Sequence, residues 1–142
     1  ALGLKAVQGL QSVAPFYWDL NDGTRAWSKR FQARHAKKMM PNDMHAGVYA
    51  ALTHYFKAVD KVGEATDGRA VVAAMKSIST DDPLFGKGSN TIYGRKLHPM
   101  YLLEAKKPGE SKGDWDFLKV AATVPAEKAF RPLAEGNCPL AK

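Results

Sequence analysis

The sequence of 142 residues has a single cysteine, no long hydrophobic run and no dense tract of one charge. Because a disulfide needs two thiols, an internal disulfide and a metal site of several thiolates are both excluded. Cys138 is therefore a free thiol or one half of a bridge to a segment outside this sequence, and the redox compartment stays open. No stretch approaches the roughly 20 apolar residues that a membrane-spanning helix needs.

Basic residues outnumber acidic ones, with a net charge of +7, but they are scattered along the sequence. Lys29, Arg30 and Arg34 fall in one expected helix, whereas Lys37–Lys38 and Lys106–Lys107 are isolated pairs. Proteins that bind nucleic acids usually concentrate Lys and Arg on one face or in one tract. We therefore predict no nucleic-acid partner and interpret the excess charge as a solvated surface.

Motifs of metal binding and catalysis are also lacking. The sequence has four histidines, His35, His45, His54 and His98. None shows the close spacing of metal ligands, and His45 and His54 fall on opposite sides of one helix because their separation corresponds to a rotation of about 180°. No serine lies in a Gly-x-Ser-x-Gly elbow, Gly86–Gly88 lacks the rest of a phosphate loop, and no acid–base pair stands out. We predict no metal, no cofactor and no enzymatic activity.

What the sequence does contain is typical of one soluble globular domain. Hydrophobic residues make up 45% and charged residues 25% of the chain, and its length suits a single modest core. The sequence begins with Ala1 rather than an initiating methionine and shows no signal peptide. We therefore expect a processed product or a piece of a longer protein.

The strongest helix signal follows Pro41, which fixes the backbone at that point. Asn42 or Asp43 is a good N-cap, and Gly63 is a typical residue just beyond a helix end. The large apolar residues of this helix recur at helical spacing and predict one apolar stripe. They are Met44, Val48, Leu52, Tyr55, Phe56, Val59 and Val62.

The first turns of this helix carry small residues and two polar rings. Ala46, Gly47 and Ala50 leave room for another backbone, and His45 and Tyr49 lie one turn apart. A helix start with exposed N–H groups, small residues and polar rings suits the edge of a ligand site. The alternative is a core helix whose end is simply exposed, and periodicity alone does not separate the two.

Weaker signals complete an α/β pattern with three main helices and a few strands. In the first half we expect a strand at 9–13, a helix at 24–35 capped by Asp22, and a helix after Asp67 that ends at 79–83. Short extended pieces between glycines follow at 84–98. The remainder is expected to form strands at 100–105 and 115–124, joined by a polar connection, and a short helix at 126–130. These strands are too few to cover three helices. The sequence therefore predicts the end of a larger α/β protein.

An aromatic run precedes the first of these helices. Phe16, Tyr17 and Trp18 are followed by Asp19, and in an extended segment neighbouring side chains point to opposite sides. At least one ring is therefore expected to face away from the core that the others join, where it is exposed or lines a cleft. The alternative is that these rings only pack between helices.

Three blocks of sequence carry a family resemblance and together span nearly the whole chain. The first block comprises residues 16–22 and 27–31. The second is 41–59, which contains His45-Ala46-Gly47-Val48-Tyr49. The third is 93–134, which contains Gly94-Arg95-Lys96-Leu97-His98-Pro99-Met100-Tyr101 and Trp115-Asp116-Phe117. They resemble the C-terminal portion of a periplasmic substrate-binding protein of the branched-chain amino acid (Leu/Ile/Val-binding) type, which serves an ATP-driven importer. Their order and spacing carry the resemblance, whereas residues 90–93 depart from the family pattern.

The resemblance implies part of a two-lobed α/β protein with the type I periplasmic-binding-protein fold. By position, residues 1–38 belong to the second lobe, 39–98 to the first lobe, and 99–142 to hinge-crossing strands and a C-terminal tail. Most of the first lobe then lies in an N-terminal part of the same protein, upstream of this sequence. The implied function is that of a periplasmic receptor that binds an amino acid or an aromatic acid and passes it to a membrane permease.

The same resemblance places the ligand cleft between the aromatic run and the start of the helix after Pro41. The residues assigned to it are Phe16, Tyr17, Trp18, Asp19, Met44, His45 and Tyr49. Rings stack on flat apolar ligands, and the polar groups of this set orient them. For His45 the alternative is a helix-end histidine in water. For the whole chain it is a stand-alone ligand-sensing or protein-interaction domain of the same architecture.

Overall fold

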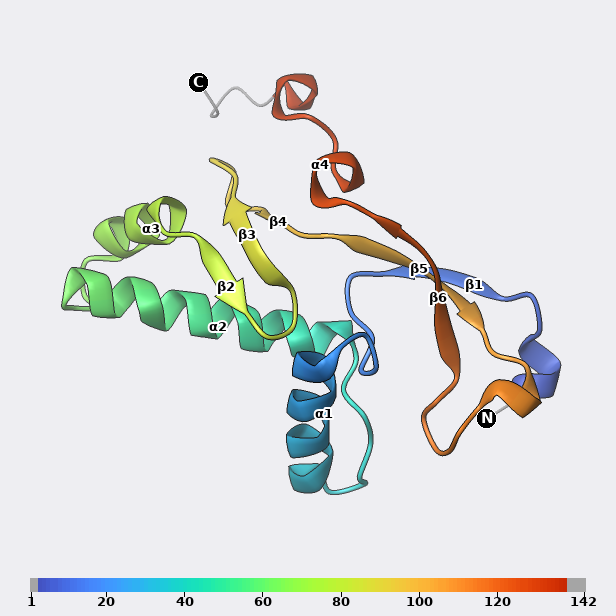
Figure 1. Cartoon of the computed structure of the whole chain (residues 1–142). Coiled ribbons are helices and arrows are strands. Elements are labelled where there is room, and N and C mark those ends of the chain that lie inside the picture. The colour runs from blue at the N-terminus through green and yellow to red at the C-terminus, as the bar shows by residue number, and fades with distance from the viewer. Residues whose placement is uncertain (1–2, 138–142) are drawn as a thin grey trace.

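The computed structural model describes residues 3–137, so Cys138 lies outside the described residues. The elements form two groups, which Figure 1 shows side by side: helices α2 and α3 with one small sheet, and a second, twisted sheet. Helix α1 lies below the junction of the two groups in this view. Within the described residues, no helix combines the length and the apolar character needed to cross a membrane.

Helix α1 (Asp22–Arg34) begins with a capping box built by Asn21 and Thr24. The Asn21 side chain accepts a hydrogen bond from the Thr24 amide at 3.0 Å, and the Thr24 hydroxyl accepts one from the Asn21 amide at 3.0 Å. The prediction of Asp22 as the cap is wrong by one residue. Asn21 has the extended backbone that an N-cap requires, and Asp22 already lies inside the helix.

Helix α2 (Asp43–Val62) has the ends that the sequence predicts. The Asn42 side chain accepts from the His45 amide at 3.2 Å, and His45 Nδ1 accepts from the Asn42 amide at 3.3 Å. Gly63 follows with a left-handed φ of 87° and donates its amide to the Val59 carbonyl at 2.8 Å. Both end signals are confirmed, because each depends only on groups within one turn of the helix end.

Helix α3 (Gly68–Ser77) packs along α2. Asp67 caps it as predicted, because the carboxylate accepts hydrogen bonds from two amides of the first turn, each at 3.0 Å. Val71 and Ala74 of α3 meet Ala58 of α2 in a buried cluster. The small alanine side chains let the two helices approach closely, so α3 covers one face of α2.

The predicted apolar stripe of α2 is divided between two faces. Its members nearer the C-terminal end of α2, Tyr55, Val59 and Val62, pack partly buried against the cluster with α3. The other four, Met44, Val48, Leu52 and Phe56, are exposed, and we name them the open face of α2. The prediction of one stripe is therefore wrong. The residues that α2 buries most are Ala46, Ala50, His54 and Ala58, because short side chains let neighbouring segments approach that face.

The first sheet joins strands from the two ends of the chain: β1 (Gln11–Ala14), β5 (Met100–Ala105) and β6 (Leu118–Val124). Strand β5 lies in the centre and pairs antiparallel with both neighbours. The two strands predicted at 100–105 and 115–124 are both present, and they pair as an antiparallel hairpin. Its second strand begins later than predicted, because Trp115 has a left-handed φ of 70° that is incompatible with extended pairing.

The second sheet consists of β2 (Thr80–Asp82), β3 (Gly86–Asn90) and β4 (Lys96–Leu97), antiparallel and in that order. The sequence predicts only a turn and short extended pieces here, because these strands are polar and glycine-rich and do not alternate. A side chain at Gly88 has no room, since a Cβ there would lie 2.6 Å from the Leu97 carbonyl oxygen.

Short helical turns complete the described chain. One at Leu4–Val7 precedes β1, and another at Pro108–Glu110 lies in the connection between β5 and β6. Helix α4 (Ala126–Ala129) confirms the predicted short helix, and Leu133–Gly136 forms the last turn. The assignment of residues 1–38, 39–98 and 99–142 to lobes and hinge stays a prediction.

Candidate functional site

Phe16 joins the two predicted cleft segments through a buried core. Its ring is 3% exposed and meets Trp27 of α1 edge-on, with ring centroids 5.8 Å apart. Ala46, in the first turns of α2, and Leu84 belong to the same buried cluster. The aromatic run and the start of α2 therefore lie together, as the sequence predicts. The Phe16 ring packs in the core and offers almost no open surface.

Tyr17 and Trp18 turn their polar tips toward the connection between β5 and β6. The Tyr17 hydroxyl donates to the Trp115 carbonyl at 2.8 Å and accepts from the amides of Phe117 and Leu118 at 3.0 and 3.2 Å. Trp18 Nε1 donates to the same Trp115 carbonyl at 2.8 Å. Trp18 also packs on the core cluster of Phe16, whereas Tyr17 lies outside that cluster. One ring of the run therefore faces away from the core, as predicted.

Asp19 is engaged in an ion pair with the first turn of α1. Its carboxylate lies 2.8 Å from a guanidinium nitrogen of Arg25, and Arg25 also reaches Asp22 at 2.7 Å. The hydrogen bonds from Asp22 first and Asp19 second raise the pKa of Arg25 above its ordinary value. Asp19 therefore has a protein partner already, and a ligand cation at this position has to compete with Arg25.

Tyr49 and residues of α1 line a concavity of about 530 Å³, and His45 contacts α1 one turn before Tyr49. The His45 ring lies 4.8 Å from that of Phe31, and the Tyr49 ring lies 5.3 Å from that of Trp27. The lining residues are Trp27, Arg30, Phe31, Arg34, His35 and Tyr49. The lining combines aromatic rings with the guanidinium groups of two arginines, a composition that suits a flat molecule with a carboxylate.

Met44 lines a different concavity of about 400 Å³, between the start of α2 and the second sheet. Gly47 and Ala51 of α2 line the same space, opposite Phe85 and His98. Its lining is mainly apolar, so it suits the body of a small molecule better than a charged group. The start of α2 thus separates two concavities, and the seven predicted residues are distributed around it rather than gathered in one pocket.

His54 is a buried polar residue of α2 that the sequence-based prediction did not include. Its Nε2 lies 2.7 Å from the Met75 carbonyl oxygen and 2.8 Å from Asn90 Nδ2. Its Nδ1 is buried without a hydrogen-bond partner in the described part of the chain. These contacts tie α2 to α3 and β3, so His54 positions the wall of the concavity that Met44 lines.

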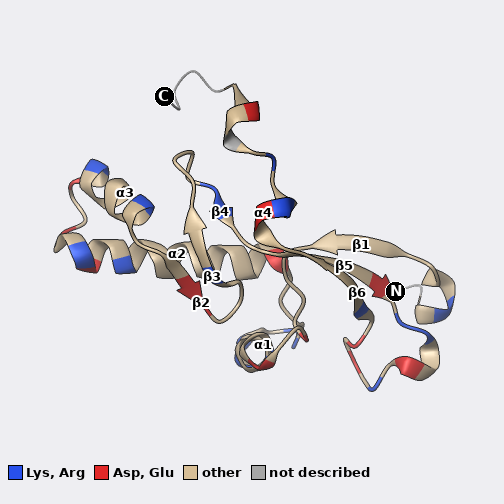
Figure 2. Cartoon of the chain, turned by 45° about the horizontal axis from the view of Figure 1, so that its top comes forward, with Lys and Arg blue, Asp and Glu red and all other residues tan. Residues whose placement is uncertain are grey.

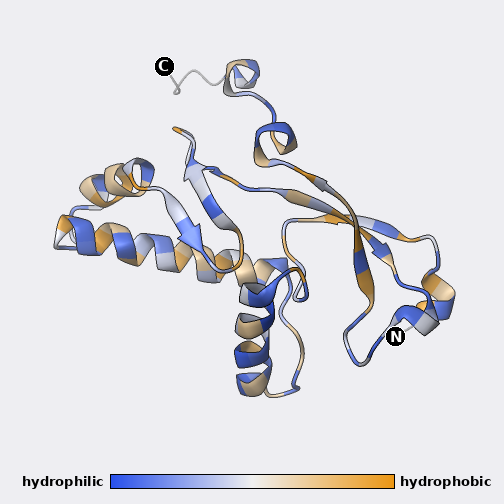
Figure 3. Ribbon diagram, viewed as in Figure 1, coloured by the Kyte–Doolittle hydropathy of each residue, from blue (hydrophilic) through white to orange (hydrophobic). Residues whose placement is uncertain are grey.

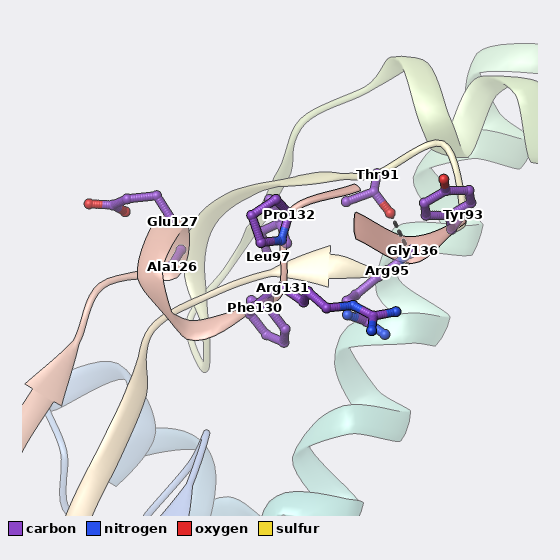
Figure 4. A pocket seen from close by; sticks show the side chains of 10 residues that line it. All are labelled: Thr91, Tyr93, Arg95, Leu97, Ala126, Glu127, Phe130, Arg131, Pro132 and Gly136. Carbon is purple, nitrogen blue, oxygen red and sulfur yellow. Dashed lines mark hydrogen bonds between the residues drawn. The ribbon is translucent and has the colours of Figure 1, made fainter. Parts of the chain in front are cut away.

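A third concavity, of about 540 Å³, lies between the turn before β4 and the C-terminal turns. Figure 4 shows Arg95 and Arg131 in its wall, and the Arg95 guanidinium lies over the Phe130 ring, 5.7 Å from its centroid. None of the predicted cleft residues lines it. Lys and Arg also occur on several other elements, as Figure 2 shows, so this concavity is not part of one basic tract.

The model of the periplasmic binding protein family matches residues 1–114, most of the 142-residue chain. The chain belongs to the periplasmic binding protein family. The family resemblance predicted from the sequence is therefore confirmed, and so is the α/β fold class. A comparison with curated proteins found no match.

Two solved structures of periplasmic binding proteins are similar to nearly the whole chain. One, from Burkholderia mallei, is 41% identical with a TM-score of 0.91 and covers 99% of this chain and 36% of its own. The other is a branched chain amino acid ABC transporter periplasmic ligand-binding protein from Burkholderia xenovorans LB400. It is 42% identical with a TM-score of 0.90, and the match covers 99% of this chain and 37% of its own. The chain thus spans little more than a third of these relatives.

A more distant binding protein shares the fold alone. This solute binding protein of an ABC transporter from R. palustris, solved in complex with benzoate, is 24% identical with a TM-score of 0.67. The similarity covers 85% of this chain and 31% of that protein.

Two tryptophans of this binding protein chain position the predicted residues. Trp27 contacts both Phe16 and Tyr49, and Trp115 accepts the hydrogen bonds of Tyr17 and Trp18. Trp27 lies one turn before Phe31 in α1, and this helical spacing of two aromatic residues was a usable signal. Trp115 had no such signal, because its role depends on a left-handed backbone and a partner far away in sequence.

Proposed function

We propose that the chain is the C-terminal portion of a periplasmic solute receptor that binds a small amino acid or aromatic acid. The receptor passes this solute to the membrane permease of an ATP-driven importer. The identity of 41% to the Burkholderia mallei binding protein over 99% of the chain carries this proposal. The Burkholderia xenovorans relative, named as a branched chain amino acid ABC transporter periplasmic ligand-binding protein, supports the importer.

The ligand surface that we propose lies around the first turns of α2. Tyr49 and His45 face α1 on one side, and Met44 lines the apolar concavity on the other. Arg30 and Arg34, which line the concavity beside α1, are suited to a carboxylate, and the rings of Trp27 and Tyr49 are suited to a flat apolar body. Tyr17, Trp18 and Asp19 contribute by fixing the segment that borders this surface. Phe16 contributes from the core.

An aromatic carboxylate fits this chemistry better than a branched aliphatic amino acid. The R. palustris binding protein solved in complex with benzoate is an example of an aromatic carboxylate bound within this fold. An amino acid also needs an acceptor for its ammonium group, and Asp19, the one acid among the seven predicted residues, is already paired with Arg25 at 2.8 Å. We therefore rank aromatic acids first and amino acids second.

Transport needs a change of shape when the solute binds. A permease distinguishes loaded from empty receptor only if the ligand favours a closed arrangement of the lobes over an open one. The contacts of His45 with Phe31 and of Tyr49 with Trp27 join residues that we assign to different lobes. These ring pairs are the contacts that we propose to tighten on closure.

The test is calorimetric titration of the longer polypeptide that contains this chain, using benzoate and leucine as separate probes. Tyr49→Ala is expected to weaken binding of the preferred probe at least about tenfold, which corresponds to about 1.4 kcal/mol. Tyr93→Ala is the matched control, because the two tyrosines are similarly exposed, at 37% and 41%, and Tyr93 lines neither concavity beside α2.

Equal effects of the two substitutions would contradict the proposed ligand surface. Failure of the parent protein to bind either class of acid would contradict the receptor proposal itself. The alternative of a stand-alone ligand-sensing or protein-interaction domain would then rank first.

A further inference from the structure

Arg95 and Arg131 line the concavity of about 540 Å³ that lies between the turn before β4 and the C-terminal turns. Both side chains are exposed, and neither forms an ion pair within residues 3–137. The one acid among the lining residues is Glu127, and Figure 4 shows its carboxylate turned away from both guanidiniums. The two cations therefore give this concavity a positive potential that attracts an anion.

The turn that carries Arg95 is held by its own backbone rather than by the Arg95 side chain. The Thr91 amide donates to the Arg95 carbonyl at 2.8 Å, and the Thr91 hydroxyl accepts from the Arg95 amide at 3.2 Å. Gly94 closes the turn with a left-handed φ of 79°. The Arg95 guanidinium lies over the Phe130 ring, 5.7 Å from its centroid, so the ring orients it. An anion then meets a guanidinium that is already in place, which lowers the cost of binding.

The rest of the lining supplies apolar surface beside the two guanidiniums. Leu97 and Phe130 are half-buried, and Ala126 and Pro132 extend this surface. The Phe130 ring meets the His98 ring edge-on, with centroids 5.3 Å apart, which attaches the C-terminal turns to the segment after β4. Figure 3 shows hydrophobic and hydrophilic residues together along α4 and the chain beyond it. The concavity therefore offers contacts to a charged group and to a short apolar body.

We propose that this concavity binds a small, soluble phosphate monoester with a short apolar body. Near neutral pH such a phosphate carries a charge of about −1.5 to −2, which complements two guanidiniums. Each planar guanidinium can donate two hydrogen bonds to a phosphate, and a volume of about 540 Å³ is typical of small-molecule sites. The site is separate from the solute surface around α2, because none of the seven residues predicted for the cleft lines it.

Calorimetric titration of the longer native polypeptide with monobutyl phosphate tests the proposal. The parent protein is expected to bind this probe, and Arg95→Gln and Arg131→Gln are each expected to weaken binding at least about tenfold. Arg95→Lys keeps the charge but loses the planar fork, so an intermediate loss is expected. Arg69→Gln on α3 is the matched control, because Arg69 is also exposed and lines none of the concavities described above.

Absence of binding by the parent protein would overturn the proposal, and so would equal losses in Arg95→Gln and Arg69→Gln. Inorganic phosphate that binds as tightly as the ester would also overturn it, because the apolar lining would then contribute nothing. A loss in Tyr49→Ala with none in Arg95→Gln would place the phosphate at α2 instead.

This test is independent of the receptor proposal, because the titration with benzoate and leucine examines the surface around α2. Tyr93 also lines the phosphate concavity, but Figure 4 shows its hydroxyl pointing away from both guanidiniums. We assign it no contact with the phosphate, so Tyr93→Ala remains the control for solute binding. Either proposal can therefore fail while the other stands.

Discussion

The Tyr17 hydroxyl donates a hydrogen bond of 2.8 Å to the Trp115 carbonyl, across 98 positions of sequence. Trp115 has a φ of 70°, a left-handed conformation that is unfavourable for a large side chain. Trp18 Nε1 donates to the same carbonyl, and the amide of Phe117 donates to Tyr17. These bonds hold the Trp115 backbone in place and attach the segment after β1 to the connection between β5 and β6.

Tyr17→Phe is expected to destabilise the chain by about 1–3 kcal/mol, because the three hydrogen bonds of the Tyr17 hydroxyl are lost, although the Trp115 carbonyl still accepts from Trp18 Nε1. Denaturant unfolding measures the loss, and hydrogen exchange at Phe117 and Leu118 should accelerate. Tyr101→Phe is the control, since Tyr101 is half-buried and its hydroxyl makes no side-chain hydrogen bond within the described residues. A similar loss in both variants would show that the bonds to the connection contribute little.

Asp116 makes the stability of the same connection depend on pH. Burial raises the pKa of its carboxyl, but the hydrogen bonds from the Lys106 ammonium and the Lys112 amide outweigh burial and hold the pKa below the ordinary 3.8. A pKa that is lower in the folded state stabilises the fold above the unfolded pKa, and this stability is lost as the pH falls through the folded pKa.

Asp116→Asn is therefore expected to lower the urea midpoint at neutral pH and to flatten its decline below about pH 4. Asp114→Asn is the control, because Asp114 is exposed and lies in the same connection. A decline as steep as that of the parent chain would mean that other carboxyl groups determine the acid sensitivity.

Glycines 47 and 88 are expected to respond to alanine in opposite directions. A Cβ at Gly88 would lie 2.6 Å from the Leu97 carbonyl oxygen and 2.9 Å from the Thr80 hydroxyl, so Gly88→Ala forces the strands of the second sheet apart. We expect a loss of about 1–3 kcal/mol. A Cβ at Gly47 meets nothing within 4 Å, and alanine favours the helix by about 0.5–1 kcal/mol. In thermal unfolding, the midpoint of Gly88→Ala should lie below that of the parent chain and the midpoint of Gly47→Ala above it.

Phe16 and Met44 were both assigned to the ligand cleft, and their burial predicts different roles in stability. Phe16→Ala empties a core position that is 3% exposed and is expected to cost about 3–5 kcal/mol. Met44→Ala changes a side chain that is 73% exposed, so its effect in this chain should stay within about 0.5 kcal/mol. Urea unfolding of the chain compares them, and equal losses would contradict the placement of Met44 on the open face.

The sequence predicted helices better than strands, for local reasons. Asn42, Gly63 and Asp67 act on backbone groups within a turn of themselves, so their effects can be read without knowing the fold. The second sheet was missed because its strands are polar and glycine-rich, and the alternation that identifies strands arises only when one face is buried. Its pairing depends on room beside Gly88, which is a property of the folded chain.

The candidate site was predictable in position but not in the orientation of its side chains. The resemblance placed the aromatic run beside the start of α2, and the core cluster of Phe16 and Ala46 joins them. Spacing could not decide that Phe16 packs inward while Tyr17 reaches the connection before β6. That choice depends on which backbone groups of distant segments lack partners, and such groups are known only once the chain has folded.

By itself, the sequence determined the family, the α/β class and the ends of the main helices, because these depend on order, spacing and local hydrogen bonding. Tertiary structure alone decided which face of α2 is covered. The helix carries a row of large apolar side chains and a row of small ones, and both satisfy the same helical period. The described segments pack on the small row because only there can a second backbone approach closely, and this leaves Met44, Val48, Leu52 and Phe56 exposed.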